Sequence, residues 1–304
     1  MNAATPSAPE EAFAIEARVV RRAFSRAGAG YDAVAVLQAR VREELLSRLE
    51  LTAITPALIL DAGAGTGHAS LALHRRYPQA RVLALDAAHG MLHEARRRQR
   101  WRRHFERICA DGAQLPLPDA SVDLVFSNLM LPWCWPDEVL GECRRVLKPG
   151  GLLALSTCGP DTLRELRTAW AAADELPHVL PFVDMHDLGD ALVRTGFASP
   201  VLDVERYVLN YADVGAAFAD LKAGGACNPL LGRRRGLTGP RRFAAMTRAY
   251  EQQRIDGRIP ATCEIVFAHA WAGGAAPHRG AAPETKVPLA RVLSQLPGRR
   301  ARGA

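Results

Sequence analysis

The sequence predicts an α/β fold with a mostly parallel, seven-stranded sheet, helices on both of its faces and an additional layer of helices before the first strand. Three observations carry this prediction. Short apolar runs of strand length alternate with helical periodicity as far as about residue 271. Acidic residues end three of the apolar runs, and alternating glycines follow the first of these runs. Ligands of open α/β sheets bind beyond the carboxyl ends of the strands, so these residues indicate a binding edge.

The N-terminal layer is predicted from the helical periodicity of residues 11–51. We expect an interruption near Ala27–Gly30, because glycines weaken helices, and a second helix that begins at Tyr31. Such a layer often covers the ligand in this class of fold. Phe24 and Tyr31 are therefore candidate lid residues, with packing in the core as the alternative.

The first predicted strand, Leu58–Asp61, leads into the glycine-rich turn Ala62–Gly67. These glycines allow close approach to a ligand, because they lack a Cβ atom and tolerate positive φ. A dinucleotide-binding turn has its third glycine where this chain has His68, which weakens an interpretation as an NAD or FAD site. A turn without a ligand is the alternative interpretation of this segment.

The next two predicted strands, Arg81–Asp86 and Arg107–Asp111, each end in a carboxylate. Asp86 stands where a parallel strand presents a carboxylate to a ribose diol. The segment Asp119–Asn128 is predicted to form a turn and a buried fourth strand. All three segments therefore end at the same binding edge.

A helix is expected over Val139–Leu147, followed by the stop signal Lys148–Gly151 and a fifth strand, Leu152–Ser156. Another helix is expected to begin at Pro160, with Asp161 in its first turn, where a carboxylate suits the helix dipole. The remaining expected elements are a helix over Asp187–Val193 capped by Gly196, a sixth strand at Pro200–Leu209, a helical lid at about 213–256 and a seventh strand at Ala261–Trp271.

Five strand ends with three carboxylates at these intervals resemble class I S-adenosylmethionine (SAM)-dependent methyltransferases, which implies a Rossmann-like sheet. A coincidental doubly wound domain is the alternative. In that class the acid at Asp61 holds the methionine end of SAM, the acid at Asp111 accepts from the adenine amine, and the fourth strand ends beside the methyl group. The cofactor-binding residues implied are Asp61, Gly63, Gly65, Gly67, Asp86, Met91, Asp111, Gly112 and Asn128.

Bulk properties exclude several classes of protein. At 48% hydrophobic and 23% charged residues, the 304-residue chain has an ordinary globular composition, and no apolar stretch is long enough for a membrane span. Residues 1–11 lack the features of a signal peptide, and the six cysteines show no metal-binding spacing, so we expect a cytoplasmic protein without a metal site. One domain is expected over 12–271, with disordered residues 1–11 and a disordered basic tail, 272–304.

The net charge of +7 includes two clusters of arginine within the expected domain. Each cluster is either a solvent-exposed face of the domain or a docking surface for an acidic partner. No nucleic-acid-binding motif accompanies them, so we expect no nucleic-acid partner. The clusters are Arg96, Arg97, Arg98, Arg100, Arg102, Arg103 and Arg107, and Arg233, Arg234, Arg235, Arg241 and Arg242.

Further motifs resemble the malonyl-[acyl-carrier protein] O-methyltransferases of biotin synthesis. The resemblance covers about residues 18–271, with departures at Ala64, Leu180 and Cys263, where Cys, Asn and Tyr are expected. The motifs are Arg22–Ala27, Tyr31–Asp32, Trp133–Cys134, Gly159–Leu166, His178, Asp184–Asp190, Leu237–Gly239, Gly257–Thr262 and His269–Trp271.

The resemblance implies methyl transfer from SAM to the free carboxylate of a malonyl thioester on acyl carrier protein. A carboxylate with a pKa near ~4 is already an anionic nucleophile at neutral pH, so we expect positioning residues and no catalytic base. Tyr31, Trp133 and His178 are expected to shape the malonyl pocket. Arg164 and Arg167 are candidate carboxylate partners, with salt bridges on the helix surface as the alternative. Acyl carrier protein is acidic, which makes it a candidate partner of Arg233, Arg234 and Arg235.

Three alternatives to this function stay open at the level of sequence. SAM-binding proteins that hydroxylate a protein arginine during assembly of respiratory complex I share the pattern of Asp161–Leu166, of His178–Phe182 and of Pro260–Thr262. A SAM-binding scaffold without activity is the second alternative. The third is a methyltransferase of quinones or phenols, which requires a base near the acceptor oxygen.

Overall fold

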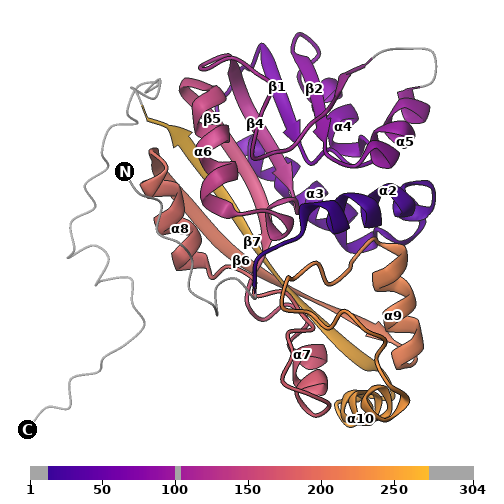
Figure 1. Cartoon of the computed structure of the whole chain (residues 1–304). Helices are drawn as coiled ribbons and strands as arrows, with labels where there is room; N and C mark the ends of the chain where they lie inside the picture. The colour runs from indigo at the N-terminus through magenta and orange to yellow at the C-terminus, as the bar shows by residue number, and fades with distance from the viewer. Residues whose placement is uncertain (1–12, 100–103, 274–304) are drawn as a thin grey trace, which may run out of the picture.

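The computed structural model describes residues 13–99 and 104–273 of the chain (Figure 1). The expected segment 1–11 and nearly all of the expected tail lie outside the described residues, as do Arg100, Arg102 and Arg103 of the first arginine cluster. No helix in the described part of the chain has the length and apolar character that a membrane crossing requires.

Seven strands form one sheet in the order β3-β2-β1-β4-β5-β7-β6, which confirms the predicted fold class. Neighbouring strands from β3 to β5 are parallel, whereas β7 is antiparallel to both β5 and β6. The chain order reverses between β1 and β4, and this reversal opens a crevice at their carboxyl ends. The strands are β1 Leu58–Ala62, β2 Arg81–Asp86, β3 Glu106–Cys109, β4 Val122–Asn128, β5 Leu147–Cys158, β6 Phe197–Tyr211 and β7 Ile259–Ala272.

Two apolar cores cover the two faces of the sheet. On one face, buried side chains of β1, β4 and β5 pack with those of α6 and α8. On the other face, alternate residues of the same strands pack with α3, α4 and α5. Successive strand residues point to opposite faces, which explains why these strands are apolar throughout. The helices are α3 Val36–Arg48, α4 His68–Arg76, α5 His89–Gln99, α6 Pro136–Val146 and α8 Met185–Arg194.

The first described helix, α2, extends over Ala17–Val34 without interruption, so the break expected near Ala27–Gly30 is wrong. The chain leaves the helix at Ala35 instead, directly before α3. Glycine serves a different purpose here: a Cβ atom at Gly28 would lie 2.8 Å from the Gly90 carbonyl oxygen of α5. Gly28 and Gly90 therefore let α2 pack closely against α5. This contact stabilises α2, although the low helix propensity of glycine would weaken it in isolation.

Several further boundaries differ from those expected. Strand β3 ends at Cys109, so Asp111 lies in the turn after it, and β6 is longer at both ends than predicted. Strand β5 begins directly after α6, and Lys148–Gly151 lies within it as a bulge, with Gly150 at φ +76°. Helix α7 comprises Arg164–Ala171 and does not begin at Pro160. Asp161 therefore lies before the helix, where it pairs with Arg206 of β6 at 3.1 Å.

Helices α9, Val214–Ala223, and α10, Pro240–Glu251, lie between β6 and β7 in the sequence. Figure 1 shows α7, α9 and α10 beyond the carboxyl ends of the parallel strands, where β6 and β7 extend past the rest of the sheet. Side chains of α7, α9 and α10 share a third apolar core with Ile259 and Tyr211. This region forms the far wall of the cavity described next.

Candidate active site

A cavity of about 700 Å³ lies at the carboxyl ends of the parallel strands. Its walls come from the turns after β1 to β5, from α2 and from the region of α7, α9 and α10. The structure brings together all the predicted cofactor residues except Asp61 and Gly67. The predicted residues that line it are Gly63, Gly65, Asp86, Met91, Asp111, Gly112 and Asn128, together with Tyr31, Trp133 and His178 on the substrate side.

The glycine turn forms an open cradle at one end of this cavity. Gly63 and Gly65 have φ of +74° and +53°, a region that disfavours other residues. A Cβ atom at Gly63 would lie 2.6 Å from Met130, whereas one at Gly65 would have no neighbour within 4 Å. The backbone at Gly65 is thus exposed to the cavity. Gly67 instead starts α4, and a Cβ atom there would lie 2.8 Å from Phe105, so its role is in packing.

The carboxylate of Asp86 braces this cradle. One of its oxygens accepts from the Gly65 amide at 2.8 Å, and the other accepts from the Ala88 amide at 2.7 Å. Burial raises the pKa of Asp86, and the two amides act against that rise. A ligand hydroxyl that donates to this carboxylate would further stabilise its charge, which is the chemistry of a ribose diol.

Asp61 lies outside the cavity, although it stands at the end of β1 as predicted. Its side chain is 1% exposed and accepts a hydrogen bond from Ser70 in α4. Burial raises its pKa to about 7, and the nearby charge of Asp86 acts in the same direction. Through Ser70, Asp61 ties the end of β1 to the helix that follows the glycine turn.

Asn128 is held by partners at both ends of its amide. Its Nδ2 atom donates to the Gln38 carbonyl of α3 at 3.2 Å, and its Oδ1 atom accepts from Ser156 of β5 at 2.9 Å. The following residue, Leu129, has φ +55° and donates its amide to the Ser156 carbonyl. These bonds orient the segment after β4, which faces the centre of the cavity.

Helix α2 is fastened to the glycine turn by Asp32. This carboxylate accepts from the Thr66 hydroxyl at 2.6 Å, lies 3.3 Å from His68 Nε2 and pairs with Arg98 of α5. Burial acts to raise the pKa of Asp32, but the hydrogen bond from Thr66 and the charge of Arg98 lower it. Helix α2, the glycine turn and α5 are therefore joined through a single ionised carboxylate.

Aromatic side chains enclose the middle of the cavity. Phe24 of α2 makes edge contacts with Trp133, at 5.1 Å between ring centroids, and with Tyr31, at 6.4 Å. Burial and the charge of Asp86 raise the pKa of Tyr31 to about 12, so its hydroxyl stays protonated at neutral pH. All three residues line the cavity.

The far end of the cavity contains His178. Its ring stacks on Trp170 of α7 at 3.7 Å, with 5° between the planes, and its Nε2 atom lies 2.7 Å from Asp174 Oδ1. These contacts fix the orientation of the imidazole. Sequence reasoning missed several other lining residues, because none of them stands within a motif that was recognised: Arg21, Trp170, Tyr211, Lys222 and Asn228.

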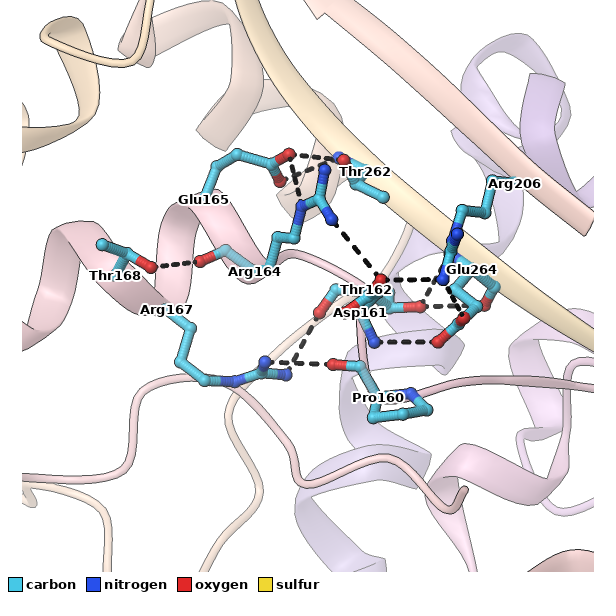
Figure 2. A network of polar contacts seen from close by, with 10 residues as sticks. All are labelled: Pro160, Asp161, Thr162, Arg164, Glu165, Arg167, Thr168, Arg206, Thr262 and Glu264. Carbon is cyan, nitrogen blue, oxygen red and sulfur yellow. Dashed lines mark hydrogen bonds and ion pairs between the residues drawn. The ribbon is translucent and has the colours of Figure 1, made fainter. Parts of the chain in front are cut away.

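A polar network supports the wall formed by Thr162 and Leu163 (Figure 2). Glu165 of α7 accepts from the backbone amide and the hydroxyl of Thr262 in β7. A second pair of hydrogen bonds joins Thr162, before α7, to Glu264 in β7. The Thr162 hydroxyl donates to the Glu264 carbonyl at 2.9 Å and accepts from the Glu264 amide at 3.1 Å. The start of α7 is thus anchored to β7.

Arg164 and Arg167 do not line the cavity. Arg164 pairs with Asp161 and Glu165, while Arg167 donates to the carbonyl oxygens of Pro160 and Thr162 (Figure 2). Both arginines therefore hold the segment before α7, which favours the structural alternative stated for them.

Comparison with known proteins places this geometry in a family. The methyltransferase domain family matches residues 60–155. A malonyl-[acyl-carrier protein] O-methyltransferase of Laribacter hongkongensis is 50% identical over 278 residues, which cover 88% of this chain and 94% of that protein. The protein of the same name from Methylovorus sp. is 49% identical over 270 residues, which cover 86% of this chain and 90% of that protein.

The chain belongs to the malonyl-[acyl-carrier protein] O-methyltransferase family. Solved structures agree on the fold. A SAM-dependent methyltransferase of Thermotoga maritima superposes with a TM-score of 0.50 at 16% identity, covering 83% of this chain and 99% of that chain. The YcgJ protein of Bacillus subtilis gives a TM-score of 0.56 at 15% identity, covering 77% and 99%.

This member of the malonyl-[acyl-carrier protein] O-methyltransferase family is a SAM-dependent enzyme. The residues at the cofactor end fit SAM, because an open glycine cradle lies beside a carboxylate that can accept hydroxyl donors. The names of the relatives favour a methyltransferase over the arginine hydroxylase alternative. Two departures from the family pattern, Leu180 and Cys263, line the cavity, whereas Ala64 lies in the glycine turn.

Proposed function

We propose that the enzyme transfers the methyl group of SAM to the free carboxylate of malonyl-acyl carrier protein, giving the methyl ester that enters the pimeloyl branch of biotin synthesis. The observation that carries this proposal is the pair of exposed cations, Arg21 and Lys222, that line the cavity. Burial raises the pKa of the lining thiols Cys134, Cys158 and Cys263 to about 12, as it does for the hydroxyl of Tyr31. These four groups are therefore protonated at neutral pH, which agrees with an acceptor that is already an anion.

Two further titratable groups that line the cavity have partners within the chain. Asp220 accepts from the Tyr211 hydroxyl at 2.6 Å, and His178 is bound to Asp174. Two cationic side chains, Arg21 and Lys222, line the cavity and are exposed. Positive charge at this position favours the binding of a carboxylate and disfavours a neutral phenol.

The residues proposed to hold the cofactor are those of the cradle and the strand ends. Bound SAM supplies an electrophilic methyl group on a sulfonium. Asp86 would accept the ribose hydroxyls and Asp111 the adenine amine, while Gly63 and Gly65 leave room for the methionine part. Asp61 and Gly67, which do not line the cavity, would act by shaping the turn.

The chain contributes alignment and the exclusion of water. Phe24, Tyr31 and Trp133 form an aromatic enclosure at the middle of the cavity, where the acceptor oxygen is proposed to meet the methyl group. A carboxylate loses part of its hydration in such an enclosure and is held in one orientation, and these effects accelerate transfer without a proton-abstracting residue. His178, fixed against Trp170, is proposed to shape the malonyl end.

Mass spectrometry of malonyl-acyl carrier protein after incubation with SAM and the enzyme tests the proposal. The expected product has gained one methyl group, and cleavage of the thioester should release that methyl group together with the acyl chain, as monomethyl malonate. Acyl carrier protein with an acetyl group provides the matched control, because it lacks the free carboxylate. Absence of the methyl ester, or equal methylation of the acetyl form, would contradict the proposed function.

The reaction is proposed to take place in the cytoplasm, where the thiols remain reduced. All six cysteines of the chain are free thiols, which agrees with a reducing compartment. The sequence prediction assigned carrier-protein docking to Arg233, Arg234 and Arg235. Arg233 and Arg235 both pair with Glu16, at 3.0 and 2.8 Å, so this group is partly neutralised within the chain.

A further inference from the structure

Helix α2 has a row of arginines on its solvent side. Arg18, Arg22 and Arg26 follow one another at intervals of four residues, which places them on one face of the helix, and all three are exposed. Within residues 13–99 and 104–273, no acidic side chain forms an ion pair with them. Like charges at this spacing destabilise a helix, so the row is unfavourable for the isolated enzyme.

The opposite side of the same helix is part of the active-site cavity. Val20 and Phe24 line the cavity wall, and Arg21, which is exposed, lines it at the edge of the helix. Lys222 of α9 also lines the cavity and is exposed. Among the described residues neither cation has an ion-pair partner. Positive charge therefore continues from the outer face of α2 to the edge of the cavity.

The position of α2 makes this face available to a large partner. The helix lies between α5 and α9, and it packs against both (Figure 1). Its only acidic residue, Asp32, is near the C-terminal end and is already paired with Arg98. The outer face of α2 is consequently cationic along its length, whereas Arg233 and Arg235 share the charge of Glu16.

We propose that the row Arg18, Arg22 and Arg26 is the docking surface for the acidic carrier protein, with Arg21 and Lys222 guiding its acyl arm into the cavity. This inference rests on the proposed function and replaces Arg233–Arg235 as the docking site. An acidic protein bound to α2 would neutralise the unpaired arginines. It would also deliver a flexible thioester arm next to the helix that forms the cavity wall. Complementary charge at such a surface increases the rate of encounter more than it changes chemistry.

Three matched double variants test the docking surface, because each reverses two exposed arginines. They are Arg18→Glu with Arg22→Glu on α2, Arg234→Glu with Arg235→Glu in the earlier predicted cluster, and Arg75→Glu with Arg96→Glu on α4 and α5. Each is assayed for kcat/KM with malonyl-acyl carrier protein and with malonyl pantetheine, which has the same arm without the protein. Calorimetric SAM binding and thermal unfolding of each variant verify an intact fold.

The α2 variant should lose about 10-fold or more in kcat/KM with the carrier protein but less than ~2-fold with malonyl pantetheine. The other two variants should stay close to the unmodified enzyme with both substrates. Added salt should slow the unmodified enzyme on carrier protein, and should slow the α2 variant much less.

Outcomes that overturn the docking surface differ from those that overturn the function. Equal loss of the α2 variant on both substrates, or unchanged turnover of carrier protein, refutes docking at α2. If only the Arg234 and Arg235 variant loses kcat/KM selectively with the carrier protein, the docking site is the cluster predicted from the sequence and not α2. If the unmodified enzyme methylates neither thioester, the proposed function itself fails.

Discussion

Replacement of Asp61 by asparagine should make the stability of the enzyme depend less on pH, so that the variant gains stability relative to the unmodified enzyme as pH rises. The Asp61 carboxyl is 1% exposed, and burial raises its pKa from the ordinary value of 3.8 to about 7. In the unfolded chain the same carboxyl ionises near 3.8. Between these two values, the unfolded state loses a proton that the folded state retains, so rising pH favours unfolding.

The size of the effect follows from the two pKa values of Asp61. Its stabilising contribution is fully present below pH 3.8, declines as pH rises and is lost above about pH 7. At ~1.4 kcal/mol for each pH unit, the whole interval corresponds to ~4 kcal/mol in the free energy of unfolding. An asparagine keeps an oxygen that can accept from Ser70 but has no charge to bury. From pH 5 to pH 8, its advantage should therefore grow by about 3 kcal/mol.

Urea denaturation monitored by circular dichroism, at several pH values from 5 to 8, measures this difference. The control is Asp190→Asn on α8, because Asp190 is an exposed side chain. Its difference from the unmodified enzyme should vary little over the same range. A Ser70→Ala variant that keeps Asp61 should extend the pH-dependent loss of stability to higher pH, since the Ser70 hydroxyl lowers the pKa of this carboxyl.

The reasoning fails if the stability difference between Asp61→Asn and the unmodified enzyme is constant from pH 5 to pH 8. It fails equally if asparagine becomes less favourable as pH rises. Either result would mean that Asp61 is ionised in the folded enzyme at pH 5, so that burial does not control its titration.

Three other predictions concern the glycine turn and helix α2. Asp86→Ala removes a charged hydrogen-bond acceptor worth at least ~1.5 kcal/mol, so the SAM dissociation constant measured by calorimetry should rise about 10-fold or more; an unchanged constant contradicts its role. Asp32→Ala removes the ion pair between α2 and Arg98 and should accelerate hydrogen exchange in α2 but not in α8. Equal protection of α2 in the variant and the unmodified enzyme would disprove this role of Asp32. Gly90→Ala should lower the melting temperature by several degrees, because its Cβ atom would lie 2.1 Å from a backbone oxygen of α2. The control is Gly30→Ala, whose Cβ atom would have no neighbour within 4 Å and which should leave the melting temperature unchanged.

Much of the cofactor end could be predicted from the sequence because its determinants are local. The turn after β1 needs glycine for its positive φ, and a carboxylate ends β2 directly, so spacing alone predicted that Gly63, Gly65 and Asp86 meet at the edge where the cavity lies. Strand β2 has the predicted bounds for the same reason. Asp61 is the exception, because a strand-end position does not show whether the side chain faces the ligand or the interior.

The boundaries that were wrong depend on contacts between distant segments. Glycine at Gly28 would weaken an isolated helix, but close packing on Gly90 of α5 keeps α2 continuous. The bulge after Leu147 lets β5 pair with β4 directly after α6, despite a proline and two glycines. Local propensity amounts to at most a few kcal/mol, and tertiary packing outweighs it at these places.

By itself, the sequence determined the α/β class, the strand order along the chain and the chemistry of the cofactor edge, because hydrophobic period and glycine spacing act over a few residues. Only the tertiary structure decided which charges are free. Arg233 and Arg18 are both arginines in basic segments. Arg233 is paired with Glu16 from a distant segment, whereas Arg18 is exposed to solvent on the outer face of α2. Pairing of charges depends on distances across the fold, and a linear sequence does not contain those distances.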